Sequence, residues 1–378
     1  MPTRRSTQSK RNKSDRKVRY AVVGLGYISQ IAVLPAFAHA RENSELVALI
    51  SDDKTKLKKL AKKYKVADTY TYETYADCLE SGNVDAVYIA LPNHMHRAYT
   101  EAAARAGVHV LCEKPMAPTE QDCEAMIAEA DRGKVKLMIA YRLHFEEGNL
   151  SAIATVQKKI GDPRIFSSNF CQQVAAGNSR LKAESKGGPL FDVGVYCINA
   201  ARNLFREEPT EVVSFTASSS DKRFAEVQEM ASALLRFPDG RLATFTASFG
   251  AADRSTFEVI GTKGVLKMDP AYEMVGDLKS ELIIGERIKK STFSKRDQFA
   301  PELSYFSNCI LKNREPEPGG LEGLADVRIV NALLESQKSG RAIKLQTLDV
   351  GKRPGVDQQI RKPPVAKSEL VHAEAPSA

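Results

Sequence analysis

The 378-residue chain contains no tryptophan, and it has no long uninterrupted run of apolar residues. Because a membrane-spanning helix needs about 18 to 20 apolar residues in a row, we expect no membrane association. The six cysteines are scattered and show no CxxC spacing: Cys78, Cys112, Cys123, Cys171, Cys197 and Cys309. Scattered cysteines of this kind are typical of reduced, buried thiols. No apolar signal segment follows Arg4-Arg5. We therefore expect a cytoplasmic protein.

The net charge of +8 lies mostly at one end of the chain. Residues 1–17 contain seven Lys or Arg and one Asp, so they carry six of the eight excess positive charges. The rest is nearly neutral, which argues against a nucleic-acid partner. A basic, Ser-rich segment predicts a flexible arm, although it could instead lie across the cofactor or another subunit. At the other end, residues 347–378 are rich in proline and charge and predict an extended tail.

A glycine-rich loop follows the first predicted strand, Val18 to Val23. The loop reads Gly24-Leu25-Gly26-Tyr27-Ile28-Ser29 and leads into an apolar helical stretch. In dinucleotide-binding folds the first glycine permits the tight turn and the second lets the backbone approach the pyrophosphate. The pattern alone is weak, because Ser29 replaces the third glycine. Its place between a strand and a helix favours a dinucleotide site that includes Gly24, Gly26, Tyr27 and Ile28.

The second predicted strand, Leu46 to Ile50, ends at Ser51-Asp52-Asp53-Lys54-Thr55-Lys56. A carboxylate at this place binds the ribose hydroxyls of NAD and repels a 2′-phosphate. Here the first residue is Ser51, and Lys56 could supply positive charge, so we favour NADP with NAD possible. The alternative is that the aspartates only cap the helix predicted from Thr55 to Tyr64.

Strand-like and helix-like segments continue to alternate as far as about residue 150. Strands are predicted at Ala86 to Ala90, His109 to Cys112 and Lys136 to Ala140, with helices between them. This alternation predicts an α/β Rossmann domain, a doubly wound parallel sheet over residues 18–150, with ligands at the carboxyl ends of its strands. The loops at those ends add candidate cofactor-binding residues: Leu91, Pro92, Asn93, His96, Glu113, Lys114 and Arg142. His94 and His96 have no third partner at a recognisable metal spacing, so we expect no metal.

After residue 150 the pattern changes to strands joined by short turns. Pro238-Asp239-Gly240 and Thr262-Lys263-Gly264 are typical hairpin turns. Helices are predicted at Leu190 to Phe205, Pro301 to Lys312 and Leu321 to Ser339. Residues 151–346 are therefore expected to form an α+β domain with a large open, mostly antiparallel sheet.

Three residues suggest acid–base chemistry. Asp192 and Tyr196 stand four apart in a predicted helix, so they would share one face, and Lys114 follows a predicted strand. A free tyrosine has a pKa of ~10, and a neighbouring ammonium favours the phenolate. Tyr196 could then accept the proton of a substrate hydroxyl while Asp192 orients that hydroxyl. From spacing alone, a helix N-terminal carboxylate and a core aromatic residue are equally good interpretations.

Together these motifs resemble the glucose-fructose oxidoreductase and inositol dehydrogenase (Gfo/Idh/MocA) family. The resemblance covers about Val18 to Leu345 and rests on the glycine loop, Pro92 to His96, Glu113-Lys114-Pro115, Tyr141-Arg142, Gly187-Gly188, Asp192 and Tyr196. Residues 298–302 and 323–328 are similar to its glucose-fructose oxidoreductase branch. The resemblance implies that Lys114 and Tyr196 are the catalytic pair and that Asp192 is the substrate-orienting carboxylate. It also implies a homodimer or homotetramer formed through the second sheet.

Tyrosine at position 196, where inositol dehydrogenase-like members usually have histidine, points to the aldose-active branch. The implied reaction is NAD(P)-dependent oxidation of an aldose to a lactone, with reduction of a second sugar by retained NADPH as an implied variant. Asp52, where many NADP-using relatives have glycine, leaves the cofactor open. A trans-dihydrodiol or xylose dehydrogenase-like enzyme and a non-catalytic NAD(P)-sensing regulator are the alternatives.

Overall fold

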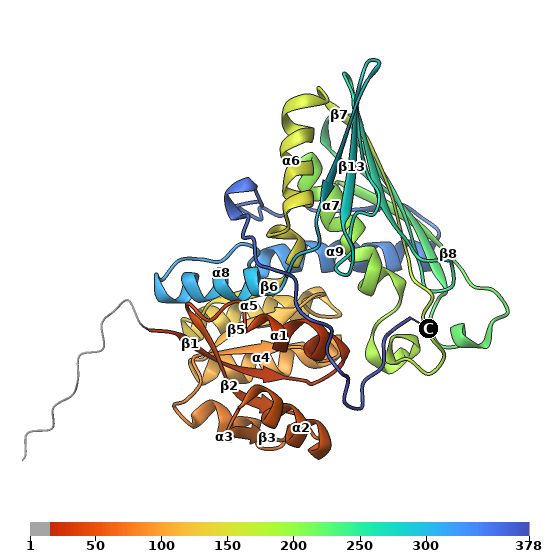
Figure 1. Cartoon of the computed structure of the whole chain (residues 1–378). Coiled ribbons are helices and arrows are strands. Elements are labelled where there is room, and N and C mark those ends of the chain that lie inside the picture. Colours follow the sequence, from red (N-terminus) through yellow and green to blue (C-terminus); the bar gives the residue numbers. More distant parts are fainter. Residues whose placement is uncertain (1–15, 378) are drawn as a thin grey trace, which may run out of the picture.

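The structure, a computed structural model, describes residues 16–377, so the predicted basic arm lies almost entirely outside the described residues. Figure 1 shows a parallel sheet with helices on both faces, and beside it a large sheet with helices along one face. No helix of residues 16–377 is long and apolar enough to cross a membrane.

The first sheet has the order β3-β2-β1-β4-β5-β6, and every neighbouring pair is parallel. Its strands are β1 Val18–Val23, β2 Ser44–Ile50, β3 Asp68–Tyr70, β4 Ala86–Ile89, β5 His109–Glu113 and β6 Leu137–Ala140. The strand order reverses between β1 and β4, and ligands of such sheets bind outside the carboxyl ends at this switch point. The predicted Rossmann architecture is confirmed.

Helices on both faces explain why the central strands β1 and β4 are mostly apolar. β1 and β4 are buried at nearly every position because neither face of the sheet meets water. The helices of this part are α1 Leu34–Ala36, α2 Lys54–Tyr64, α3 Tyr75–Glu80, α4 His96–Arg105 and α5 Glu120–Gly133. A further helical turn, Ser29–Val33, precedes α1 and directly follows the glycine loop.

The second sheet has the order β14-β13-β12-β11-β7-β10-β9-β8-β15. Its strands are β7 Pro163–Cys171, β8 Glu211–Ala217, β9 Met230–Arg236, β10 Leu242–Ser248, β11 Arg254–Gly261, β12 Val265–Met268, β13 Leu278–Ile284, β14 Arg287–Phe293 and β15 Ile343–Lys344. All neighbours are antiparallel except β7 and β10, so the sheet is mixed. The long connection from β7 to β8 includes α7 (Val195–Phe205), and such a crossover lets β10 align in the direction of β7.

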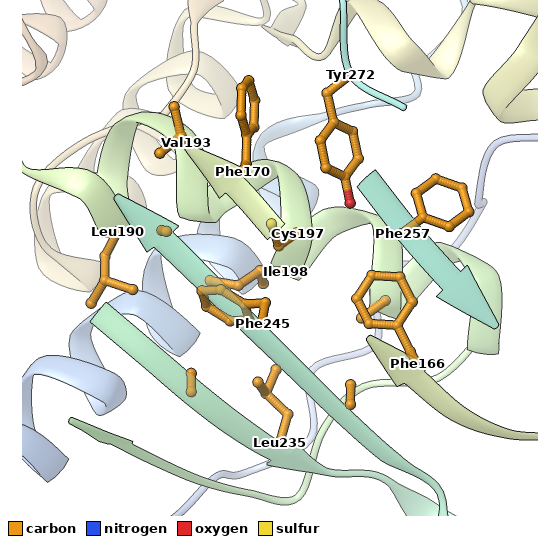
Figure 2. Close-up of a cluster of buried hydrophobic side chains, with 14 of the residues drawn as sticks. Phe166, Phe170, Leu190, Val193, Cys197, Ile198, Leu235, Phe245, Phe257 and Tyr272 are labelled. Atoms are coloured by element: carbon orange, nitrogen blue, oxygen red, sulfur yellow. The ribbon is translucent and has the colours of Figure 1, made fainter. Parts of the chain in front are cut away.

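Three helices cover one face of the second sheet: α6 Glu147–Lys159, α7 and α9 Gly320–Ser339. Figure 2 shows the core between α7 and the sheet, where Cys197 and Ile198 belong to one cluster with Phe166, Phe245 and Phe257. Along β9, buried and exposed residues alternate, as expected for a sheet with one covered face. The opposite face leaves several large apolar side chains exposed, among them Ile165, Phe215, Leu234 and Leu242.

Two helices from the C-terminal half also contact the first domain. In α8 (Ala300–Leu311), Ser307 lies 2.8 Å from the Tyr20 hydroxyl of β1. In α9, a side-chain carbon on Gly323 would come within 2.8 Å of Met116, so only glycine allows this close approach. These contacts fix the second sheet relative to the carboxyl edge of the first.

Candidate active site

The glycine loop forms the turn that the sequence predicts at the end of β1. Gly24 has φ +91°, and a Cβ there would lie 2.5 Å from the carbonyl oxygen of Ala90, just after the neighbouring strand β4. Gly26 has open space beside it, since an added Cβ would meet nothing within 4 Å. Ser29, in place of the third glycine, donates a hydrogen bond of 2.6 Å to the Gly24 carbonyl. The turn is therefore tight at Gly24 and is stabilised by the Ser29 hydroxyl. The open space at Gly26 would let a pyrophosphate approach the backbone.

At the end of β2, both aspartates make local structural contacts. Asp52 accepts a hydrogen bond from the Tyr72 backbone N–H at 2.9 Å. Asp53 is the N-cap of α2 and accepts from the N–H groups of Thr55 and Lys56, which lowers the pKa of the Asp53 carboxyl. The capping interpretation, left open from the sequence, therefore holds for Asp53. Ser51 is buried, and its hydroxyl oxygen accepts from the Asp53 N–H at 3.2 Å.

His96 joins the loops that follow β4 and β5. Its ring is fully buried, with Nε2 2.8 Å from the Leu91 carbonyl and Nδ1 3.1 Å from the Pro115 carbonyl. Burial lowers the pKa of His96 despite these bonds, so the neutral ring is favoured. Its contacts with the candidate site run through the two loops. Within residues 16–377, no three His, Cys, Asp or Glu side chains gather as a metal site would require.

Lys114 lies at the centre of the candidate site, on the loop after β5. Its ammonium donates to the Asp192 backbone carbonyl at 2.9 Å and to Asp192 Oδ1 at 3.3 Å. The same nitrogen lies 4.7 Å from the centre of the Tyr196 ring. Burial lowers the pKa of Lys114, but Tyr196, Asp192 and Glu113 outweigh it, so the pKa is raised overall. Lys114 is therefore a fixed cation at neutral pH.

Asp192 bridges two cations. Its Oδ2 accepts from Arg180 Nε at 2.6 Å, while Oδ1 faces Lys114. Burial alone would raise the pKa of Asp192, but Arg180 and Lys114 lower it to about 2. The carboxylate is ionised, and both of its oxygens are engaged. In this structure Asp192 holds Lys114, and its predicted contact with a substrate hydroxyl stays a prediction.

Tyr196 lies in the first turn of α7, just after the helical turn Leu190–Gly194 that contains Asp192. Besides Lys114, the Arg142 guanidinium carbon lies 5.1 Å from its ring centre. Phe170 packs edge-on against the ring at 5.3 Å. Arg142 is itself fixed by the Tyr272 carbonyl at 2.6 Å. The Tyr196 ring therefore contacts two cations and one other aromatic ring.

Glu113 is the buried partner of the Lys114 loop. The Tyr88 hydroxyl donates to Glu113 Oε1 at 2.9 Å. Burial raises the pKa of Glu113, and the nearby Lys114 only partly counters this effect. The loop that carries Lys114 is thus tied to β4, next to the switch point of the first sheet.

The structure brings together the residues predicted for catalysis, although they come from both halves of the chain. A pocket borders this cluster and is lined by Lys114, Tyr141, Arg142, Tyr196, Asn199, Asn203 and Phe257, among others. Asn93 reaches across from the first domain and donates to the Lys186 carbonyl at 3.3 Å. No sequence pattern pointed to Arg180, because it lies in a single short turn, Ser179–Leu181, within an irregular connection.

Two family models match the chain in the order of its two sheets. Residues 18–141 match the oxidoreductase family with an NAD-binding Rossmann fold, and residues 153–267 match the GFO/IDH/MocA C-terminal domain. The D-xylose 1-dehydrogenase [NADP(+)] of Haloarcula marismortui is 31% identical over 341 residues, which cover 88% of this chain and 94% of that protein. The chain belongs to the Gfo/Idh/MocA family.

Two further members of the Gfo/Idh/MocA family illustrate the range of named substrates. The crystal structure of aldose-aldose oxidoreductase from Caulobacter crescentus, complexed with glycerol, has 38% sequence identity and a TM-score of 0.83. The match covers 87% of this chain and all of that one. The trans-1,2-dihydrobenzene-1,2-diol dehydrogenase of Sus scrofa is 28% identical over 84% of this chain and 95% of its own. The predicted family is confirmed, and the substrate differs among relatives.

Proposed function

We propose that this protein is an NAD(P)-dependent sugar oxidoreductase that prefers NADP and acts on the anomeric carbon of an aldose. The observation that carries the proposal is the grouping of Lys114, Asp192 and Tyr196 in one cluster assembled from both domains. A nucleotide-binding turn alone would serve a sensor as well. An ammonium beside a phenol adds a path for a proton, which a sensor does not need.

Each residue of the cluster has its own role in the oxidation. In the oxidation, the substrate C–H bond releases a hydride and its O–H bond releases a proton, which leaves a lactone. Tyr196 is assigned as the proton acceptor, because its ring lies 4.7 Å from the Lys114 ammonium. Asp192 and Arg180 hold Lys114 in position. When bound, the nicotinamide supplies the hydride acceptor.

The contacts at the end of β2 support the proposed preference for NADP. A free carboxylate there would repel a 2′-phosphate. Asp52 is turned to the Tyr72 backbone, and Asp53 to its own helix N-terminus and to the imidazole of His372. The residue that begins this loop is Ser51, and Lys56 stands on the first turn of α2. The named cofactor of the Haloarcula relative is also NADP.

If the protein keeps its cofactor between turnovers, the NADPH formed from one sugar would reduce the carbonyl of a second. The name of the Caulobacter relative, aldose-aldose oxidoreductase, supports such a cycle. The pig relative supports a second candidate, oxidation of a dihydrodiol by the same residues. Both candidates place the proton on Tyr196, so they differ only in substrate.

The first experiment is mass spectrometry of the nucleotide released from the purified protein. Glucose, xylose, other aldoses and a trans-dihydrodiol are then added while the absorbance of reduced nicotinamide is followed. Bound NADP that an aldose reduces stoichiometrically supports the proposal. Reduction by the dihydrodiol alone would favour the second candidate, and bound nucleotide that no substrate reduces would favour a sensor.

Tyr196→Phe tests the mechanism, with Tyr305→Phe on α8 as a matched control outside the cluster. Loss of a proton acceptor typically costs a factor of about 10² to 10⁴, so we expect turnover to fall by that much while nucleotide affinity changes little. Tyr305→Phe should keep full turnover. If Tyr196→Phe also kept it, the assignment of Tyr196 would be wrong.

We also propose that the protein forms a homodimer or homotetramer through the outer face of the second sheet. Phe215 on β8 is 73% exposed, and Leu234 on β9 is 39% exposed. Exposed apolar side chains gathered on one sheet face are typical of a contact surface between proteins. A second copy of the same sheet would offer a self-complementary partner.

A further inference from the structure

The last part of the chain runs across both domains. After β15, residues 345–377 form no further strand or long helix, and Figure 1 shows this segment in dark blue, passing α1 and turning near α2 before it ends beside the second sheet. Its first half is anchored to the second domain. Arg353 forms a 2.6 Å ion pair with the buried Glu208, and Arg361 pairs with Glu147 at 2.6 Å.

The next contacts are with the two loops of the cofactor site. The Val371 backbone donates to Gln30 Oε1 at 2.8 Å, and Gln30 Nε2 donates to the Val371 carbonyl at 2.9 Å. Gln30 is buried in the helical turn after the glycine loop, and it also donates to the Leu25 carbonyl at 2.9 Å. The Val371 backbone is thus joined through one side chain to the phosphate turn itself.

The following residue contacts the ribose end of the site. His372 adopts φ +46°, a conformation uncommon outside glycine, and its Nδ1 lies 2.9 Å from Asp53 Oδ2. Asp53 stands two residues after Ser51, in the loop that begins α2. Asp53 therefore has one oxygen on the N-terminus of α2 and the other on the His372 imidazole.

The chain then returns to the second domain. Ala175 donates its backbone N–H to the Pro376 carbonyl at 2.9 Å, and Ser377 forms an isolated antiparallel bridge with Val174, just after β7. Residues 368–377 therefore connect the carboxyl edge of the first sheet to the second domain. They do not fill the phosphate turn, because the space beside Gly26 is open for 4 Å.

We propose that residues 368–377 are a strap that retains the dinucleotide and favours the form with a 2′-phosphate. The inference deepens the proposed function, because a protein that oxidises one sugar and reduces another must keep its cofactor between the two steps. The strap is fixed at both ends and crosses the loops that follow β1 and β2. Nucleotide can then leave only when the contacts of Val371 and His372 open.

Release of NADPH from the full chain and from a chain that ends at Pro364 tests the strap. The shorter chain keeps the Arg353 and Arg361 anchors. Each protein is loaded with NADPH, mixed with excess NADP, and followed by nicotinamide fluorescence. We expect release to be at least tenfold faster without the strap, while reduction of added saturating NADP by an aldose stays within twofold. Equal release rates would overturn the proposal, and so would tighter nucleotide binding by the shorter chain, since the segment would then be a competitor.

Two full-length variants keep the test decisive if the shorter chain does not fold. Val371→Pro removes the N–H that donates to Gln30, so it should also speed release. His372→Ala should lower the ratio of NADP to NAD affinity several-fold, and an unchanged ratio would overturn the role of His372. Glu374→Ala is the matched control, because this exposed strap residue makes no ion pair among the described residues. Release is measured without sugar, so the strap is tested even if no aldose is oxidised.

Discussion

Replacing Asp192 with asparagine should show how much the ion pairs of this carboxylate with Arg180 and Lys114 stabilise the folded protein. Asp192 contacts Arg180 at 2.6 Å and Lys114 at 3.3 Å, and its side chain is 19% exposed. Its pKa is about 2, against an ordinary value of 3.8. This difference corresponds to about 2 kcal/mol of stabilisation of the folded protein. The asparagine side chain would keep the shape of the carboxylate and lose its charge.

The sign of the pH dependence follows from the lowered pKa. The unfolded chain takes up the proton more readily than the folded one, so the stabilisation is complete above about pH 4 and is lost as pH falls towards 2. Asp192→Asn should therefore be less stable than the unchanged protein by about 2 kcal/mol at pH 7. The difference should shrink steadily below pH 4, because the variant has no group to titrate there.

Urea unfolding at several pH values from 7 to 3 measures this difference directly, and contributions of all other carboxylates cancel between the two proteins. Asp239→Asn is the control, since this side chain is 73% exposed and its change should alter stability by less than about 0.5 kcal/mol. Turnover of Asp192→Asn should also fall, because Lys114 loses a partner. A stability difference of equal size at pH 7 and pH 3 would refute the reasoning.

Three further predictions concern the fold, the nucleotide turn and the outer sheet face. Arg202 is fully buried and pairs with Glu208, Glu322 and Asp326, so Arg202→Met should cost about 3 to 5 kcal/mol in urea unfolding. Gly24→Ala should weaken NADP binding at least tenfold in a fluorescence titration, since its Cβ would collide with the Ala90 carbonyl and its φ is +91°; unchanged affinity would contradict the turn geometry. Phe215→Arg should dissociate the proposed oligomer in light scattering coupled to gel filtration, whereas Lys222→Arg, at an exposed and already charged position, should leave it intact.

The local sequence pattern was enough to predict the architecture of the first domain. Its central strands are covered on both faces, so they appear in the sequence as short apolar runs between helical segments, whereas the edge strand β3 has no such run. The glycine loop, the Asp53 cap and the Lys114 loop all lie next to such strands and could be placed from the order of elements. The hairpin β13–β14 was not foreseen, because its many lysine, serine and glutamate side chains hide the alternation expected of strands.

The candidate site was only partly predictable. Asp192 and Tyr196 could be paired because they are four residues apart on one helical segment, and family resemblance linked them to Lys114. Their contacts could not be deduced: Arg180 reaches Asp192 from an irregular connection, and Arg142 is held against Tyr196 by the Tyr272 carbonyl. These contacts join residues far apart in the chain, and no local periodicity encodes them.

The C-terminal tail was also predictable only in part. Proline and charge predicted an extended segment, and the structure gives it almost no regular elements. Where an extended segment lies depends on which distant groups can satisfy its backbone, and here those groups are Gln30 and Val174. The Rossmann domain and its nucleotide turn can be predicted from the sequence alone, because short-range sterics and hydrophobic periodicity set them. Only the folded protein shows which cations surround Asp192 and which segment crosses the cofactor site. Those contacts depend on how the two domains pack.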